Sequence, residues 1–176
     1  MPMRVAVGSD HAGFDLKEIL RAELAALGHD VADLGTHDAT TSVDYPDYGA
    51  AVGRAVADGL ADLGVCVCGS GNGIAMAANK VPGVRAAVVH DVTTASLAGR
   101  HNQANVVCFG ARTTGTIVVI DALHAFLDAP KEHGRHDGRI EKLAALDDHD
   151  LDDHGNALGH AHDRELVHLT APEGTP

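Results

Sequence analysis

A cysteine beside a glycine-rich turn is the feature of this chain that most directly indicates chemistry. Cys68 opens the run Cys-Gly-Ser-Gly-Asn-Gly at residues 68–73, directly after the apolar stretch at 64–67. The thiol would then stand at the end of a buried strand, followed by a turn whose backbone amides can face an anion. A base or nucleophile next to an anion cradle is typical of a catalytic site.

The elements that must position this site follow from the hydrophobic pattern. Short apolar runs predict strands at residues 4–8, 31–34, 64–68, 84–89 and 106–109. Helical spacing, turn signals and caps predict helices at 14–27, 46–58, 74–79, from Asp91 towards His101, and at 115–127. This alternation predicts an α/β protein: a three-layer, Rossmann-like, five-stranded parallel sheet with helices on both faces.

A second polar cluster, Ser9-Asp10-His11, follows the first predicted strand. In a flavodoxin-like strand order, 2-1-3-4-5, the first and third strands are neighbours at the point where the chain reverses direction across the sheet. Ligands bind in the crevice at such a point. We therefore expect Asp10 and His11 to share one crevice with Cys68.

Composition excludes several classes of protein. The 176 residues are 45% hydrophobic but only 3% aromatic, without tryptophan, so a single aliphatic core is expected. A formal charge of −12 argues against a nucleic-acid partner. The absence of a long apolar stretch or a signal-peptide pattern argues against a membrane protein and favours the cytoplasm.

The cysteines do not form a disulfide framework, because there are only three. Cys66 and Cys68 would share one face of a strand, but a lone pair of this spacing is a weak zinc signal. Cys66 and Cys108 are therefore expected to be core residues. The glycine runs also fail the dinucleotide and Walker patterns, since Phe14 and Asp15 stand where a Walker loop needs lysine and a hydroxyl.

Seven blocks along the chain resemble the type B ribose-5-phosphate isomerases and their galactose-6-phosphate isomerase relatives. The blocks lie in order between about residues 4 and 146, at 9–14, 44–46, 68–73, 77–80, 101–102, 109–112 and 134–136. The resemblance implies isomerisation of a sugar phosphate through an enediolate without a metal or cofactor. The simplest reaction is ribose 5-phosphate to ribulose 5-phosphate, in the pentose phosphate pathway. A tetrose or hexose phosphate, or a non-catalytic sugar-phosphate-binding subunit, is the alternative.

The resemblance also implies roles for individual residues. Cys68 would be the base that moves the α proton, with Ile74 marking the cysteine type rather than the type with a glutamate in this loop. Ser70 would assist proton transfer between oxygens, Asp10 would bind sugar hydroxyls, and His101 would open the furanose ring. The residues implied in substrate binding are His11, Tyr45, Gly69, Gly71, Asn72, Gly73, Ile74, Asn102, Arg112, Arg135 and Arg139.

Several of these residues also have a plain structural interpretation, and for Cys68 it is that of a small core residue. Asp10 and His11 could merely cap the following helix, and His101 could be a histidine favoured by a helix C-terminus. Arg135 and Arg139 are four residues apart, so they would lie on one face of a last helix, either as a phosphate clamp or as a solvated pair.

The resemblance implies a homodimer, with a tetramer as the alternative, in which Cys68 from one chain and His101 from the other form each site. The isomerase domain would span residues 1–146. Residues 147–176 form a distinct acidic tail, with eight acidic residues against one arginine and five histidines. Such a tail could bind a divalent metal, but adventitious or no binding is the preferred interpretation.

Overall fold

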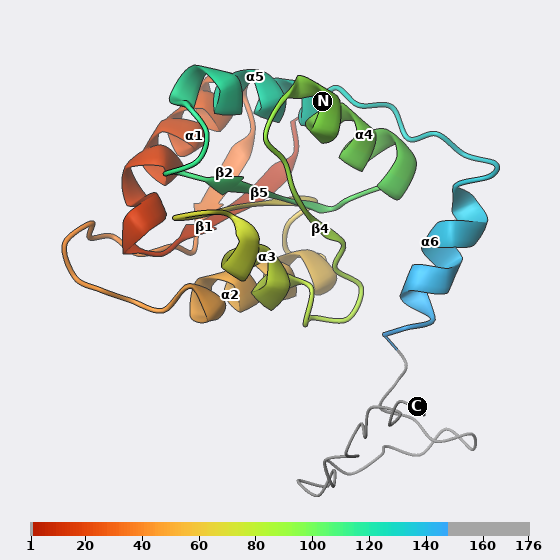
Figure 1. The fold of residues 1–176 in the computed structure, drawn as a ribbon, viewed down its shortest axis with the longest axis horizontal. Coiled ribbons are helices and arrows are strands. Elements are labelled where there is room, and N and C mark those ends of the chain that lie inside the picture. The colour runs from red at the N-terminus through yellow and green to blue at the C-terminus, as the bar shows by residue number, and fades with distance from the viewer. Residues whose placement is uncertain (1, 148–176) are drawn as a thin grey trace, which may run out of the picture.

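A computed structural model describes residues 2–147 of the chain, and it contains the predicted five-stranded parallel sheet (Figure 1). The strands are β1 (Arg4–Ser9), β2 (Asp30–Asp33), β3 (Leu63–Cys68), β4 (Ala86–Val88) and β5 (Val106–Gly110). The helices are α1 (Phe14–Ala26), α2 (Tyr45–Ala57), α3 (Asn72–Ala78), α4 (Val92–Asn102), α5 (Thr116–Leu127) and α6 (Asp137–Ala144), with a short 3-10 turn, η1 (His11–Gly13), after β1. The predicted elements are thus confirmed within a few residues at each end.

Two separate apolar layers hold the helices to the sheet. On one face, α1, α4 and α5 pack on the valines of β1, β3 and β5 and on Phe109. On the other face, α2 and α3 pack on Ala6 and the strand cysteines through Val52 and Ile74. Figure 1 shows these two helical layers above and below the sheet. The core is mainly aliphatic, as the scarcity of aromatic residues predicted.

The strand order corrects one detail of the expectation. The observed order is β2-β1-β3-β5-β4, so the last two strands exchange places relative to 2-1-3-4-5. All five residues of β5 are buried, whereas the three residues of β4 are only half-buried. The more apolar strand therefore takes the inner position beside β3, and the short strand becomes the edge. The contact between β1 and β3, where the site was predicted, is unaffected.

Helix ends follow local chemistry. Asp91 begins α4 with a capping box, in which its carboxylate accepts from the Thr94 amide at 2.7 Å. Gly28, at φ +85°, follows the end of α1, as expected for a residue that can adopt the left-handed conformation. Both positions were predicted as helix boundaries.

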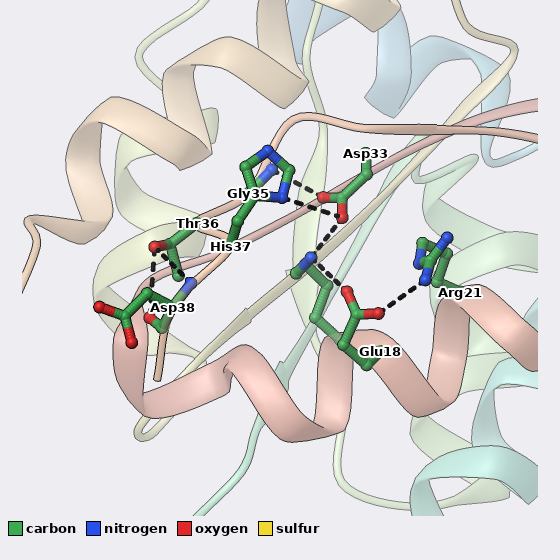
Figure 2. A network of polar contacts seen from close by, with 8 residues as sticks. Glu18, Arg21, Asp33, Gly35, Thr36, His37 and Asp38 are labelled. Atoms are coloured by element: carbon green, nitrogen blue, oxygen red, sulfur yellow. Dashed lines mark hydrogen bonds and ion pairs between the residues drawn. The ribbon is translucent and has the colours of Figure 1, made fainter. Parts of the chain in front are cut away.

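A partly buried ion-pair network fixes α1 to the end of β2 (Figure 2). The Lys17 side chain is fully buried, and its ammonium group pairs with Asp33 and, at 2.7 Å, with Glu18. Asp33 in turn accepts the Gly35 amide at 2.9 Å. Because Gly35 begins the loop at 35–44 that leads to α2, this network fixes the start of that loop.

The last helix differs from the expectation and stands apart from the sheet layers (Figure 1). It begins at Asp137, so only Arg139 is helical, whereas Arg135 precedes it, next to Gly134 at φ +82°. The prediction that both arginines share a helical face is therefore wrong. None of the α6 residues is buried. In the described part of the chain, no helix has the length and apolarity needed to cross a membrane.

Candidate active site

The register of β1 and β3 brings the two predicted polar clusters together. Ser9 pairs with Val67 across the two strands, so the residues that follow, Asp10 and Cys68, emerge side by side at the carboxyl edge of the sheet. They line an open cleft of about 380 Å³. Its walls are Asp10, His11, Ala12, Tyr45, Cys68, Gly69, Ser70, Gly73, Arg112 and Thr113.

Cys68 is held by the turn that follows it. The residue is 4% exposed, and its Sγ accepts a hydrogen bond from the backbone N–H of Gly71 at 3.2 Å. Gly71 adopts φ +82°, and a Cβ there would stand 3.0 Å from the backbone of Phe109. The glycine turn therefore directs a backbone N–H at the sulfur and fixes its position at the edge of the cleft.

Tyr45 closes the cleft against the same turn. The tyrosine is the first residue of α2, and its ring lies on Gly73, where a Cβ would come within 2.6 Å of Cζ. Gly73 therefore leaves room for the ring. Tyr45 itself is 41% exposed, so one side of the ring remains open to a ligand.

Asp10 combines both of its sequence interpretations. One carboxylate oxygen, Oδ1, caps η1 by accepting the Gly13 amide at 3.0 Å, while the residue also lines the cleft. His11 is held through Nδ1, which lies 3.2 Å from the backbone N and O of Val43. This contact joins His11 to the loop before α2. Because Nδ1 is engaged there, Nε2 is the ring nitrogen that remains available to a ligand.

Arg112 is the predicted arginine that reaches the cleft. Its side chain lies beside Gly69, 3.6 Å from the position of a Cβ there, and its amide donates to the Gly69 carbonyl at 2.9 Å. Among the remaining loop residues, Ser70 Oγ accepts weakly from the Asn72 amide at 3.4 Å. Ile74 is fully buried in the core, so only its backbone can face a substrate.

Seven predicted residues do not line this cleft. Three of them, Gly71, Asn72 and Ile74, belong to the turn and helix that follow Cys68, whereas the other four, His101, Asn102, Arg135 and Arg139, come from later segments. His101 and Asn102 end α4, which runs back to the edge where the strands begin. There the carbonyl of Asn105 accepts the amide of Gly64, at the start of β3, whereas Cys68 ends that strand. About 13 Å of strand separates Gly64 from Cys68. One chain therefore places the two predicted groups at opposite edges of its sheet.

The other cysteines are core residues, as expected. Cys66 and Cys108 are paired neighbours in β3 and β5, fully buried on the face covered by α2 and α3. Contact with Cys66 and burial raise the pKa of the Cys108 thiol well above its ordinary value. Cys108 therefore stays protonated and apolar.

Sequence reasoning missed several participants. Thr113 lines the cleft, and Val43 holds His11. Glu132 and His136 surround His101, with one Glu132 oxygen 3.2 Å from its Nε2. His136 had a signal in the Gly-Arg-His block at 134–136, whereas Glu132 had none.

The predicted tail at 147–176 lies outside the described residues except for Asp147, which accepts a hydrogen bond from the Gly83 amide at 2.8 Å.

A thiol, a glycine turn and a carboxylate at the switch point of a parallel sheet define an α/β protein built to handle a small anionic substrate. A family model described as Ribose/Galactose Isomerase matches residues 5–143, and the chain belongs to that family. It is 41% identical to ribose-5-phosphate isomerase B of Escherichia coli K12, an alignment covering 82% of this chain and 96% of the relative.

Solved structures agree with this assignment. Ribose-5-phosphate isomerase B of Clostridium thermocellum superposes with a TM-score of 0.80 at 42% identity, covering 82% of this chain and 97% of that one. The Mycoplasma genitalium enzyme, solved with bound ribulose 5-phosphate, gives a TM-score of 0.78 at 40% identity, covering 81% and 95% of the two chains. The predicted family and fold are therefore confirmed.

Proposed function

We propose that this chain isomerises ribose 5-phosphate to ribulose 5-phosphate through an enediolate. The observation that carries the proposal is the Cys68 thiol, which accepts the Gly71 amide at the switch-point cleft of a ribose/galactose isomerase fold. The similarity to isomerases that act on ribose 5-phosphate supports the choice of sugar. No step is assigned to a metal or a cofactor.

The residues of the cleft can supply the chemistry of proton transfer. Cys68 takes the proton from C2 of the open-chain aldose and returns it to C1, while Ser70 moves a proton between the two oxygens. Backbone amides of residues 69–74 stabilise the enediolate charge. Asp10 orients sugar hydroxyls through the carboxylate oxygen that does not cap η1, and Tyr45 covers the sugar. His11 and Arg112 face the substrate beside them.

Ring opening and phosphate binding need a second copy of the chain in this proposal. His101 opens the furanose ring, Asn102 holds an enediolate oxygen, and Arg135 and Arg139 bind the phosphate. Because these four lie away from Cys68 in their own chain, a two-fold homodimer in which each cleft receives them from its partner completes both sites. The two arginines of the partner also supply positive charge to the substrate phosphate, which an acidic protein must provide locally.

In this proposed role the enzyme acts in the pentose phosphate pathway of the cytoplasm. Three free cysteines, all buried, fit a reducing compartment.

A panel of four- to six-carbon aldose phosphates, followed by detection of the ketose, tests the proposal. We expect ribose 5-phosphate to give the highest kcat/KM and free ribose to be converted at least a hundred-fold less efficiently, because it lacks the phosphate that the arginines bind. Preference for a tetrose or hexose phosphate would change the substrate. Binding of sugar phosphates without any ketose formed would identify a non-catalytic subunit instead.

A further inference from the structure

Glu132 connects two side chains at the end of α4 and lies outside the cleft of Cys68. Its Oε1 accepts Arg100 Nε at 2.8 Å, and its Oε2 lies 3.2 Å from Nε2 of His101. Its backbone amide donates to the Arg100 carbonyl at 2.9 Å, which ties the segment before α6 to this helix. One carboxylate therefore contacts both the arginine and the histidine that end α4.

Neighbouring groups keep the Glu132 carboxylate ionised. The hydrogen bond from Arg100 lowers the pKa of Glu132, so the group is ionised at neutral pH. On the other side, His136 stacks on His101, with ring centroids 4.3 Å apart and planes inclined by 9°. Burial lowers the pKa of His136, which favours a neutral ring. His101 is thus held between an anion at its edge and a neutral ring on its face.

Three potential metal ligands, His101, Glu132 and His136, lie within 4.8 Å of one another here. Their geometry argues against a metal site. An imidazole binds a metal in the plane of its ring, and a single ion cannot lie in two parallel planes that are stacked on each other. Arg135 Nε also donates to Nε2 of His136 at 3.3 Å, so that nitrogen is already engaged.

We propose that Glu132 is a positioning residue for His101 in the opening of the sugar ring. The carboxylate holds Nε2 and keeps its proton there, which leaves Nδ1 as the nitrogen that faces the substrate. Nδ1 takes the proton of the anomeric O1 hydroxyl and delivers it to the ring oxygen O4 as the C1–O4 bond breaks and the C1=O1 bond forms. This inference rests on the proposed function, because it concerns the ring opening that His101 performs there.

Ring opening can be separated from proton transfer by the choice of substrate. Ribose 5-phosphate exists mainly as a furanose, whereas ribulose 5-phosphate is an open chain, because the oxygen that would close a five-membered ring carries the phosphate. Exchange of solvent deuterium into C1 of ribulose 5-phosphate therefore needs the base but no ring opening. The two assays report on different residues of one site.

In Glu132→Gln we expect kcat for ribose 5-phosphate to fall roughly 10- to 100-fold, the usual loss when the partner of a functional histidine is removed. Deuterium exchange into ribulose 5-phosphate should stay within about two-fold of the wild type. His101→Asn should show the same split, and Glu132→Gln should add little to it. Glu132→Asp, which keeps the charge but shortens the side chain, should show the split to a smaller extent.

Glu23→Gln is the matched control, because Glu23 pairs with Nε2 of a remote histidine, His124, at 2.8 Å. It should leave both assays unchanged. Equal losses in the two assays of a folded Glu132 variant would indicate a merely structural role, and unchanged isomerisation would also overturn the proposal. If Glu132→Gln does not fold, Glu132→Asp decides between these results. A wild type that neither isomerises nor exchanges would refute the proposed function instead.

Discussion

The environment of single residues at the candidate site depends on backbone groups that the glycine turn brings to them. Cys68 is almost completely buried, yet its sulfur receives a directed N–H from Gly71 and faces a cleft shared with Asp10. Cys66, two residues earlier on the same strand, is packed entirely in the core. The proposed base and the core cysteine therefore differ in the turn that follows the strand rather than in the strand itself.

Replacing Cys68 by alanine tests its assignment as the base. We expect turnover of ribose 5-phosphate to fall by roughly 10² to 10⁴-fold, the range for loss of a positioned base, with little change in the melting temperature. Deuterium exchange at C1 of ribulose 5-phosphate should fall in parallel, which distinguishes this variant from Glu132→Gln. Cys66→Ala is the control for loss of a buried thiol. Near-normal exchange in Cys68→Ala would exclude the base assignment.

The contact between Gly73 and Tyr45 predicts a coupled pair of substitutions. A Cβ at residue 73 would come within 2.6 Å of the Tyr45 ring, and because that ring is partly exposed it can swing outward. We expect Gly73→Ala to raise KM for ribose 5-phosphate about ten-fold without a large loss of stability. In a Tyr45→Ala background the same substitution should have little further effect, since neighbouring residues couple. Additive losses in the double variant would show that Gly73 acts independently of the ring.

Among the elements, α1 and β2 are joined by a lysine, although lysine side chains are usually exposed at the surface. Lys17 is the one lysine among the buried residues of the described chain, and its ammonium group is satisfied by Asp33 and Glu18 (Figure 2). Through Asp33 and Gly35 the pair fixes the start of the loop that later contacts His11. This network connects a stability element to the cleft.

Lys17→Met should lower the free energy of unfolding by roughly 3 kcal/mol at pH 7, because it leaves carboxylates without their buried counterion. Contact with Lys17, and then with Arg21, lowers the pKa of Glu18 to about 2. The stabilisation from Glu18 is present above its unfolded pKa of about 4.5 and is lost as the pH falls towards 2. The difference between the wild type and Lys17→Met should therefore shrink over that range in urea unfolding experiments.

The exposed Lys80 provides the control, since Lys80→Met should change stability by less than about 0.5 kcal/mol. A difference between the wild type and Lys17→Met that is constant from pH 6 to 2.5 would contradict the contribution of Glu18.

How far the sequence predicts these elements depends on which forces position them. Short apolar runs predicted every strand, and helical spacing with caps and turn signals predicted the first five helices, because local sequence decides these elements. The exchange of β4 and β5 could not be predicted, since it depends on which strand buries more surface beside β3. The prediction that Asp10 and His11 share one cleft with Cys68 followed from the parallel topology of the sheet. Lys17 and Glu132 carry no motif, because their partners come from distant segments.

At the scale of the whole molecule, the proposed site residues of one chain lie at two opposite edges of the sheet. This separation constrains how two chains can assemble into a dimer with complete sites. The cleft with Cys68 opens at the carboxyl edge of the sheet, and the His101 group lies at the other edge. Between β4 and α6 lies a larger cavity of about 650 Å³, which includes Asn102 but none of the residues around Cys68. Leu143 and Leu146, on and just after α6, are 44% and 56% exposed. Apolar surface on a projecting helix fits contact with a second copy, which the proposed homodimer supplies.

Mixed dimers test the shared site directly. Cys68→Ala and His101→Asn are prepared separately, each nearly inactive on ribose 5-phosphate, and are then unfolded, mixed equally and refolded together. In a mixed dimer one site receives both substitutions and the other receives neither. Random reassortment makes about half of the dimers mixed, so roughly a quarter of the wild-type activity should return. Refolding each variant alone is the control. If native mass measurements show mixed dimers while activity stays at the level of the separate variants, Cys68 and His101 do not complement each other across the two-fold axis, and the composite site is wrong.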